Sequence, residues 1–350
     1  MIRMKFPQFI SFTVTNACNL RCRMCGQWSE KGYVRSRTID ADTKMTLADW
    51  KRLVDEISGH DIRFVLIRGG EPFLFPDIME LLEYIYCHGL FISIDTNGTL
   101  LREYIADLVH FSDKMHITFS VDGPEEIHDQ VRCVRGAYQT TKNNIAVLLE
   151  AEKNRKQKIS KSICFTISPC SYRGLGKMPG VARSMAIHSI NIVPYYYCPE
   201  TVGRKYEEEL MQHFQCQAFS WRGFHHDRSG IDFNIFRKEY REYLDNLNGI
   251  SNFPYMPLTE NQYRSWFDDP LSPVGSPACM NVEKLIDIQP DGRANFCVDF
   301  PDYSMGNVTE SAIGKIWNSP EAERFRQYRR KKPLAICYRC GARYISEIQS

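Results

Sequence analysis

The stretch FISFTVTNACNLRCRMCGQW, residues 9–28, joins a short apolar run to three closely spaced cysteines. The run over 9–15 is rich in Phe, Ile, Thr and Val, which are residues that β-strands favour. The cysteines behind it, Cys18, Cys22 and Cys25, have the spacing CxxxCxxC. Three thiolates on one loop can converge on a single metal centre. The sequence therefore predicts a strand that carries a metal-binding loop at its carboxyl end.

Five more strand-like runs follow, and amphipathic stretches of helical period separate them. Strand and helix patterns that alternate in this way predict an α/β fold with a parallel sheet. The strands are dense in Val, Ile and Phe, so we expect both faces of the sheet to be covered. Ligand sites in such folds lie at the carboxyl ends of the strands, where the polar and Gly-rich motifs of this chain also fall. The six runs are FISFTVT (9–15), IRFVLIRG (62–69), LFISIDT (90–96), KMHITFS (114–120), KSICFTIS (161–168) and HSINIVPY (188–195).

The chain of 350 residues is long enough for about two domains. We expect a βα domain over residues 1–198 and a cysteine-bearing domain over residues 276–350. The latter has a hairpin signal, LIDIQPDGRANFCV (285–298), with a Pro-Asp-Gly turn. Between them, residues 199–275 are rich in aromatic, Asn and His residues, and neither a helix nor a strand period persists there. We interpret this segment as an insertion or linker that packs over the mouth of the first domain.

Composition excludes several classes of protein. Hydrophobic residues make up 43% of the chain and charged residues 25%, which is typical of a globular protein and not of a disordered, fibrous or membrane protein. Lys and Arg number 44 against 42 Asp and Glu, for a net charge of +2. A nucleic-acid-binding protein usually has a clearer basic excess, so this class is disfavoured.

The 13 cysteines are an unusual count, and an odd number cannot pair completely in disulfides. The N-terminal residues have no apolar core or cleavage site of a secretory signal, so we predict a cytoplasmic protein. Thiols stay reduced in the cytoplasm, and clustered thiols are there more often metal ligands than bridges.

The metal of the first loop is predicted from the number of its ligands. Zinc normally takes a fourth protein ligand, and no candidate stands near Cys18, Cys22 and Cys25 in the sequence. Three thiolates on a [4Fe-4S] cluster instead leave one iron open to an outside ligand. A zinc knuckle is the alternative.

In this context of strand and loop the chain resembles the radical S-adenosylmethionine (SAM) superfamily. The resemblance implies a partial (β/α)6 TIM-like barrel, with SAM chelating the open iron of the cluster. It also implies reductive cleavage of SAM to a 5′-deoxyadenosyl radical, which abstracts a hydrogen atom from a substrate. The protein would orient this chemistry and exclude side reactions.

Other motifs resemble the SAM-binding residues of that family. In the GGEP motif, residues 69–72, the resemblance assigns Glu71 to the methionyl amine of SAM, a role that suits an unpaired carboxylate at a strand end. Arg132 is preferred to Arg135 as the partner of the SAM carboxylate. Met24 replaces an aromatic residue that packs on adenine in the family, and a thioether can make a similar contact. The complete predicted set is Met24, Gly69, Gly70, Glu71, Pro72, Thr96, Asn97, Ser120, Asp122 and Arg132.

Four later cysteines are Cys279, Cys297, Cys337 and Cys340, and the spacing from Cys279 through Gly292 to Cys297 resembles the opening of the SPASM domain of radical SAM enzymes. Their number matches its shortened form, called Twitch, so the resemblance implies a small α+β domain with one auxiliary [4Fe-4S] cluster. Four thiolates suit a closed cluster that transfers electrons. A structural zinc site is the alternative, because four cysteines with a CxxC end are also a zinc pattern.

We therefore expect a radical SAM oxidoreductase whose auxiliary cluster oxidises the substrate radical, in a dehydrogenation or a bond-forming reaction. Asp299 is the predicted proton acceptor, with Asp302 second, although an Asp in a surface turn is an equal interpretation. The alternative function is a redox-neutral epimerase or isomerase in which Cys198 returns a hydrogen atom. A more distant alternative is a zinc-binding regulatory protein. Cysteines outside the two sets are interpreted as small hydrophobic residues, namely Cys87, Cys133, Cys164, Cys170, Cys198 and Cys216.

The predicted partners are a small-molecule or peptide substrate and an electron donor of flavodoxin or ferredoxin type. Peptide-modifying relatives often carry a leader-binding domain before the barrel. Cys18 comes early in this chain, which favours a small molecule or a separate recognition protein. The basic run RFRQYRRKKP (324–333) is interpreted as a solvated helix face, or else as a docking site for the acidic electron donor.

Overall fold

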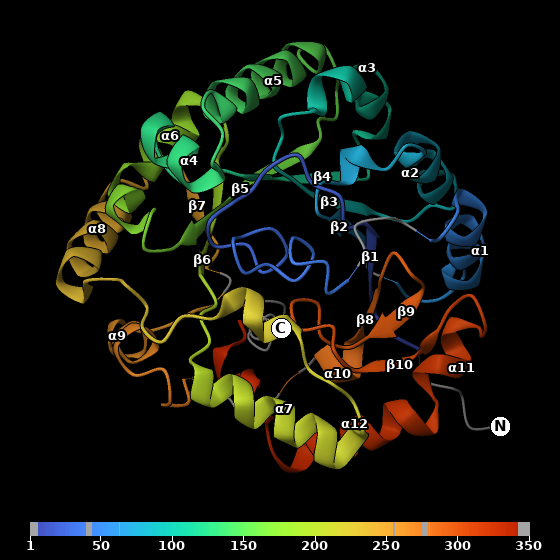
Figure 1. Ribbon diagram of the computed structural model, residues 1–350. Helices are drawn as coiled ribbons and strands as arrows, with labels where there is room; N and C mark the ends of the chain where they lie inside the picture. Colours follow the sequence, from blue (N-terminus) through green and yellow to red (C-terminus); the bar gives the residue numbers. More distant parts are fainter. Residues whose placement is uncertain are drawn as a thin grey trace.

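The computed structural model describes residues 6–39, 44–62, 64–254, 256–274, 279 and 281–341. The described strands form one sheet, in the order β10-β9-β8-β1-β2-β3-β4-β5-β6-β7. Strands β1 to β6 are parallel neighbours, which confirms the predicted α/β fold. The sheet curves around the loop that follows β1, drawn in blue at the centre of Figure 1. The parallel strands are β1 (Phe9–Thr15), β2 (Phe64–Gly69), β3 (Ile92–Thr96), β4 (Met115–Ser120), β5 (Ser160–Ile167) and β6 (Ser189–Pro194).

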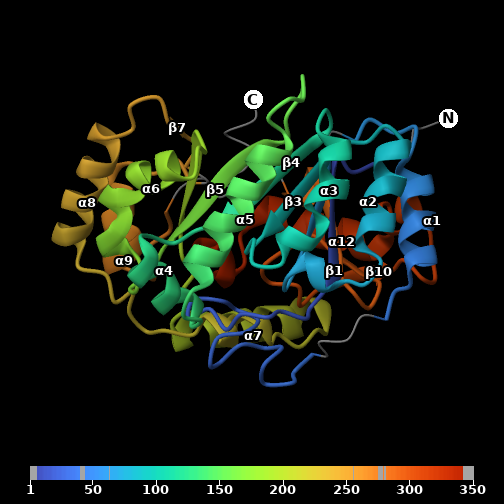
Figure 2. The same cartoon turned by 90° about the horizontal axis from the view of Figure 1, so that it is seen from above.

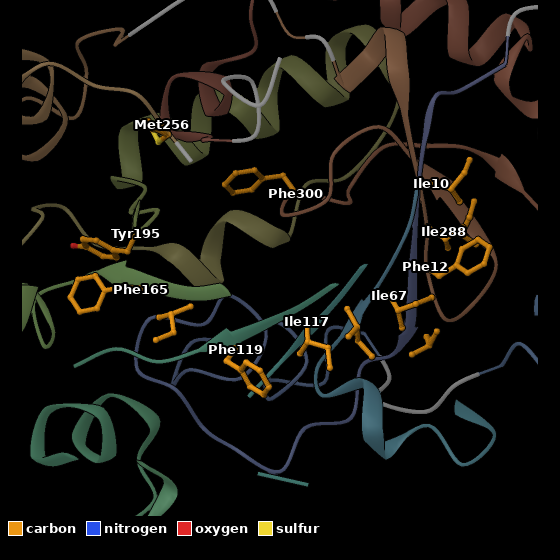
Figure 3. Packing of buried hydrophobic residues seen from close by; sticks show 14 of the residues in the cluster. Ile10, Phe12, Ile67, Ile117, Phe119, Phe165, Tyr195, Met256, Ile288 and Phe300 are labelled. Atoms are coloured by element: carbon orange, nitrogen blue, oxygen red, sulfur yellow. The ribbon is translucent and has the colours of Figure 1, made fainter. Parts of the chain in front are cut away.

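The hydrophobic core lies between the strands and the outer helices. On β1, Ile10 and Phe12 are fully buried, and the Phe12 ring lies 4.8 Å from that of Trp50. Figure 3 shows Ile67, Ile117, Phe119 and Phe165 of the following strands in the same core, among the labelled residues. Polar residues alternate with these apolar ones, because successive side chains of a strand point to opposite faces. The inner-face positions are therefore more polar than the outer ones, although on β1 Ser11 and Thr13 are buried as well.

Helices join the strands and cover their outer face (Figure 2). In α1, Thr46 and Asp49 form a capping box that satisfies free N–H groups at the start of the helix. Leu53, Val54 and Ile57 recur at helical spacing behind Trp50 and are buried. The helices of this layer are α1 (Leu47–Ile57), α2 (Ile78–Cys87), α3 (Ile105–Leu108), α4 (Glu125–Arg132), α5 (Ala137–Ala151) and α6 (Met178–Ser184).

The described part of residues 199–275 contains three α-helices, where the sequence led us to expect no persistent period. They are α7 (Glu200–Phe214), α8 (Phe233–Asp245) and α9 (Glu260–Asp268), and the two-residue strand β7 (Ser251–Asn252) pairs with β6. Helix α8 packs beside the 3₁₀ turn Tyr172–Lys177, where the Glu239 carboxylate accepts a hydrogen bond from the Gly176 N–H (3.0 Å). The division into three domains stays a prediction, and its boundary at 275–276 lies outside the described residues.

The C-terminal part continues the barrel sheet. Strand β8 (Leu285–Ile288) pairs in parallel with β1 and forms the predicted hairpin with β9 (Arg293–Asn295), and β10 (Ser304–Asn307) pairs antiparallel with β9. Gly292 supplies the positive φ of +85° that the turn requires. The helices here are α10 (Asn281–Lys284), α11 (Ile313–Trp317) and α12 (Pro320–Lys331). Within the described ranges, every helix is too short or too polar to cross a lipid bilayer.

Candidate active site at the carboxyl ends of the strands

The loop after β1 gathers the three N-terminal cysteines in the mouth of the barrel. Burial raises the pKa of Cys18 to about 12 and that of Cys22 to about 11, and burial also raises the pKa of Cys25. Cys22 and Cys25 raise the pKa of Cys18 further, and Cys25 raises that of Cys22. Backbone N–H groups of Leu20 and Trp28 donate to the sulfurs of Cys18 and Cys25, both at 3.4 Å.

These thiols fit a bound iron-sulfur cluster. Without metal they would be neutral at pH 7, and coordination to a metal ion deprotonates a thiol outright. Donors already aimed at two of the sulfurs suit the thiolate form. Across the described ranges, no three His, Cys, Asp or Glu side chains are arranged to hold a single metal ion. The prediction that Cys18, Cys22 and Cys25 hold a cluster therefore depends on their burial, their mutual electrostatic effect and these donors.

Gly69 and Gly70, at the end of β2, lie directly against the start of the cysteine loop. A Cβ on Gly69 would stand 2.2 Å from the Thr15 carbonyl oxygen, and one on Gly70 would stand 2.2 Å from that of Ala17. The Gly70 N–H donates to the Thr15 carbonyl at 2.8 Å. Glycine is therefore needed at both positions because two backbones meet there.

Glu71 differs from the expected unpaired carboxylate. It is fully buried and accepts hydrogen bonds from the Thr96 hydroxyl (2.7 Å), the Asn97 N–H (2.8 Å) and the Phe73 N–H (3.3 Å). Burial raises its pKa to about 7. The carboxylate thus ties the end of β2 to the end of β3, and contact with SAM remains a prediction. Pro72 begins the 3₁₀ turn that follows.

Asn97 links the end of β3 to the cysteine loop. Its side-chain NH₂ donates to the Asn19 amide oxygen at 2.9 Å, and Asn19 donates in turn to the Thr99 hydroxyl at 2.8 Å. Asn19 is adjacent to Cys18 in the chain. The predicted residues Thr96 and Asn97 therefore lie with Glu71 and the cysteine loop in one hydrogen-bonded unit.

Asp122, just beyond β4, is joined to the cysteine loop through Arg132. The Arg132 guanidinium forms an ion pair with the Asp122 carboxylate (2.5 Å) and donates to the Cys22 sulfur (3.5 Å). Asp122 also accepts from the Thr166 N–H on β5, at 2.9 Å. Its own N–H donates to Nδ1 of His128, whose pKa burial and Arg132 lower to about 3, so the imidazole is neutral.

The structure separates the two candidate arginines. Arg132 is 7% exposed and lies against the thiols, whereas Arg135 is exposed to solvent. Of the other predicted SAM-binding residues, Ser120 ends β4 and is half-buried, and Met24 is half-buried against the core. These positions agree with the preference for Arg132, and the SAM-binding roles stay predictions.

Replacing Arg132 with leucine should lower the free energy of unfolding by about 3–5 kcal/mol, because Asp122 then keeps a buried charge with no cation beside it. Arg135→Leu is the matched control and should change it by about 0.5 kcal/mol or less, since its side chain is at the surface. Urea-induced unfolding of the three proteins measures the difference. Adding Asp122→Asn to Arg132→Leu should restore part of the loss. Equal stability of Arg132→Leu and the parent would contradict this account of the pair.

The four C-terminal cysteines also gather. Burial raises the pKa of Cys297 well above its usual value, and Cys337, Cys279 and Cys340 raise it further in that order. Cys337 and Cys340 lie on a 3₁₀ turn, Ala335–Arg339, and at its end. Its N-terminal Ala335 N–H donates to Glu209 of α7 at 2.7 Å. The burial of Cys297 and the effect of the other three cysteines on it fit the predicted second cluster.

The two candidate proton acceptors have different surroundings. Asp302 is buried and accepts from the Tyr206 hydroxyl and from the backbone and hydroxyl of Ser220, so it fastens α7 and the following segment to the C-terminal part. Asp299 is 22% exposed and lies 3.7 Å from Arg68 of β2. Asp299 is therefore the candidate proton acceptor that lies toward the inside of the barrel.

The inner face of the sheet carries charged residues that our interpretation of the sequence missed. Arg68 on β2 is the register partner of Thr13 on β1. The negative charges of Asp299, Asp287 and Asp95 favour the charged form of its guanidinium. Burial raises the pKa of Asp287 to about 6 and also raises that of Asp95. The available signal was the alternation of Ser93 and Asp95 with apolar residues in ISIDT, together with the single charged residue Arg68 in the otherwise apolar run FVLIRG.

The remaining cysteines are not all core residues as expected. Cys87 and Cys133 are exposed. Cys198 is fully buried in the core and its thiol donates to the Pro199 carbonyl, so no part of it is presented to a substrate in this structure. Cys164 is on the inner-face register of β5, opposite Ser120, and lies close to Asp122. A hydrogen-donating thiol at the inner face is thus better placed at Cys164.

The basic run of α12 is only partly solvated, contrary to expectation. Arg326 and Arg329 are buried, and the Arg326 guanidinium lies 4.2 Å above the Trp317 ring. Arg330 is exposed and pairs with Glu283 at 2.8 Å. One face of this helix, which carries Ala322, Phe325, Arg326 and Arg329, is therefore buried.

Two family models match the chain. Residues 12–165 match the model described as the radical SAM superfamily, and residues 279–341 match an iron-sulfur cluster-binding domain called SPASM. The first match contains the three-cysteine loop with Glu71, Asp122 and Arg132. The second contains all four C-terminal cysteines.

Curated relatives and a solved structure agree with these matches. The chain is 31% identical over 147 residues to an AdoMet-dependent heme synthase of Methanosarcina barkeri, which is 42% of this chain and only 40% of that relative. It is 22% identical over 363 residues to the antilisterial bacteriocin subtilosin biosynthesis protein AlbA of Bacillus subtilis, covering 98% of this chain and 68% of AlbA. The structure of Streptococcus suis SuiB bound to precursor peptide SuiA superposes with a TM-score of 0.66 at 16% identity, covering 97% of this chain and 71% of SuiB. This last likeness is one of fold.

Proposed function

The chain belongs to the radical SAM superfamily and carries a C-terminal SPASM domain, and on this premise we propose that it oxidises a peptide or a small molecule by a radical mechanism. Cys18, Cys22 and Cys25 would hold a [4Fe-4S] cluster that binds SAM. Cys279, Cys297, Cys337 and Cys340 would hold a second one. The observation that carries the proposal is the buried path from Cys22 through Arg132 to Asp122, which joins the cysteine loop to the end of β4.

When bound, the first cluster would supply the electron for cleavage of SAM to a 5′-deoxyadenosyl radical, which takes a hydrogen atom from the substrate, and the second cluster would accept an electron from the substrate radical. The chain's own residues prepare this site. Glu71, held by Thr96 and Asn97, fixes the backbone against which the methionyl group of SAM would lie. Arg132 places a buried positive charge beside Cys22, where the SAM carboxylate needs a partner.

The segment after β6 helps to exclude water from the site. Gly223 lies so close to the cysteine loop that a Cβ on it would stand 2.0 Å from the Gly26 carbonyl oxygen. The Ser29 hydroxyl donates to the Gly223 carbonyl at 3.3 Å. A site closed in this way protects a reactive radical from side reactions. Figure 2 shows the blue cysteine loop and α7 at the same end of the molecule.

The substrate would lie against the polar inner face, between the two cysteine sets. Asp299 is proposed to accept a proton as the substrate radical gives up its electron, because it faces Arg68 on the inner face and is only two residues beyond Cys297. AlbA is a bacteriocin biosynthesis protein and SuiB binds a precursor peptide, which supports a peptide substrate; the heme synthase supports a small molecule. A flavodoxin- or ferredoxin-type protein would supply the first electron.

Anaerobic purification followed by iron, sulfide and zinc analysis tests the proposal. We expect about eight iron atoms per chain and, with SAM and dithionite, formation of 5′-deoxyadenosine. A colourless protein with about two zinc ions would indicate the zinc-binding alternative. An iron-loaded protein that leaves SAM intact would refute the proposed function.

A further inference from the structure

Arg329 is a buried arginine on α12 that lies against the C-terminal cysteines. It is 5% exposed. Its Nη1 donates to the Lys332 carbonyl at 2.8 Å. The guanidinium is in hydrogen-bonding contact with Cys279 and interacts with the charges of Cys337 and Cys297. Its Nη2 is buried with no hydrogen-bond partner in the described part of the chain.

A buried guanidinium is costly unless a negative group offsets its charge. No carboxylate of the described residues forms an ion pair with Arg329, whereas its neighbour Arg330 pairs with Glu283 and Glu323. An iron-sulfur core together with four thiolate ligands carries a net negative charge. The cysteines beside Arg329 are thus the anions that its position requires.

We propose that Arg329 raises the reduction potential of the auxiliary cluster and so makes this cluster an electron acceptor. The inference rests on the proposed function, since it assumes a cluster at Cys279, Cys297, Cys337 and Cys340. Reduction adds one electron and therefore one negative charge to the cluster. A fixed positive charge that donates to a cluster sulfur stabilises the reduced form more than the oxidised form. In turnover the electron comes from the substrate radical, which also loses one proton to a base; in the test it comes from dithionite.

The test compares Arg329→Gln with the unchanged protein and with Arg330→Gln, all loaded with both clusters. Arg330→Gln removes the same charge one residue away, at a side chain that is exposed and paired at the surface. Iron is counted first. Each protein is then titrated anaerobically with dithionite and redox mediators, and each cluster is followed by electron paramagnetic resonance. Addition of SAM identifies the signal of the first cluster.

We expect Arg329→Gln to favour the oxidised auxiliary cluster by about tenfold, equivalent to a potential lower by about 59 mV for a one-electron couple. The potential of the SAM-binding cluster and the rate of SAM cleavage should not change. Arg330→Gln should titrate like the parent protein. Arg329→Lys keeps the positive charge on a shorter side chain and should give a reduction potential between those of Arg329→Gln and the parent.

The outcomes separate the two proposals. A parent protein with about four iron atoms, or with zinc in the second site, would refute the auxiliary cluster itself. Two clusters with an unshifted potential in Arg329→Gln would overturn the role of Arg329 alone. If Arg329→Gln fails to assemble the cluster, Arg329→Lys decides the matter, and a potential equal to that of the parent would overturn the inference.

Discussion

We expect replacement of Cys22 with alanine to abolish SAM cleavage and to remove about half of the bound iron. Cys22 is the cysteine of the loop that receives the Arg132 hydrogen bond, and it is 8% exposed. Two thiolates cannot hold a cubane that needs three protein ligands and an open iron. The loss should therefore be complete, with 5′-deoxyadenosine at the level of a reaction without enzyme. Cys18→Ala and Cys25→Ala should behave alike.

Cys87→Ala is the matched control for this experiment. Cys87 ends α2 and is exposed, with its thiol donating to Glu83 on the same helix. Its replacement should leave iron content and SAM cleavage unchanged. Substantial SAM cleavage by Cys22→Ala would show that the loop does not carry the reactive cluster.

Replacement of Cys337 with alanine should separate the two parts of the reaction. The variant should keep SAM cleavage, because the cysteine loop, Glu71 and Arg132 belong to the barrel. It should lose about four iron atoms and form no oxidised product, because three of the four auxiliary ligands remain and a closed cluster needs all four. Iron analysis, 5′-deoxyadenosine release and product assays on candidate peptides and small molecules measure the three effects.

Cys133→Ala serves as the control for Cys337→Ala, since Cys133 is exposed at the end of α4. An unchanged yield of product from Cys337→Ala would exclude an auxiliary cluster from the oxidation. Loss of SAM cleavage together with the iron would show that the two sites are not independent.

Local patterns predicted the barrel well. The first run, residues 9–15, is found as β1 (Phe9–Thr15) with the same bounds, since its buried apolar positions alternate with Ser11 and Thr13. The order of motifs also placed Glu71, Asp122 and Arg132 around one loop. The preference for Arg132 came from that order alone, and the structure adds that Arg132 reaches Cys22.

Tertiary contacts explain what sequence patterns missed. In α7, Gly203 weakens the helical signal, but the absence of a side chain lets Trp221 pack against the helix. Helix α8 had a readable signal in the Asp232 cap and in Phe233 and Phe236 at helical spacing, which the surrounding aromatic residues obscured. The surroundings of Asp299 and Asp302 depend on distant residues, since Arg68, which lies opposite Asp299, is 231 positions before it in the chain, and no local pattern contains them.

The pairing of β8 with β1 has a consequence for the synthesis of the protein. Strand β1 carries the cysteine loop and lies between β2 and β8, yet β8 begins only at Leu285. During translation, β1 therefore stays at the edge of the growing sheet, with one row of backbone groups unpaired, until most of the chain has left the ribosome. A contact between such distant strands is slow to form. Insertion of iron at the N-terminal loop before that moment would occur in a barrel that is still open on one side.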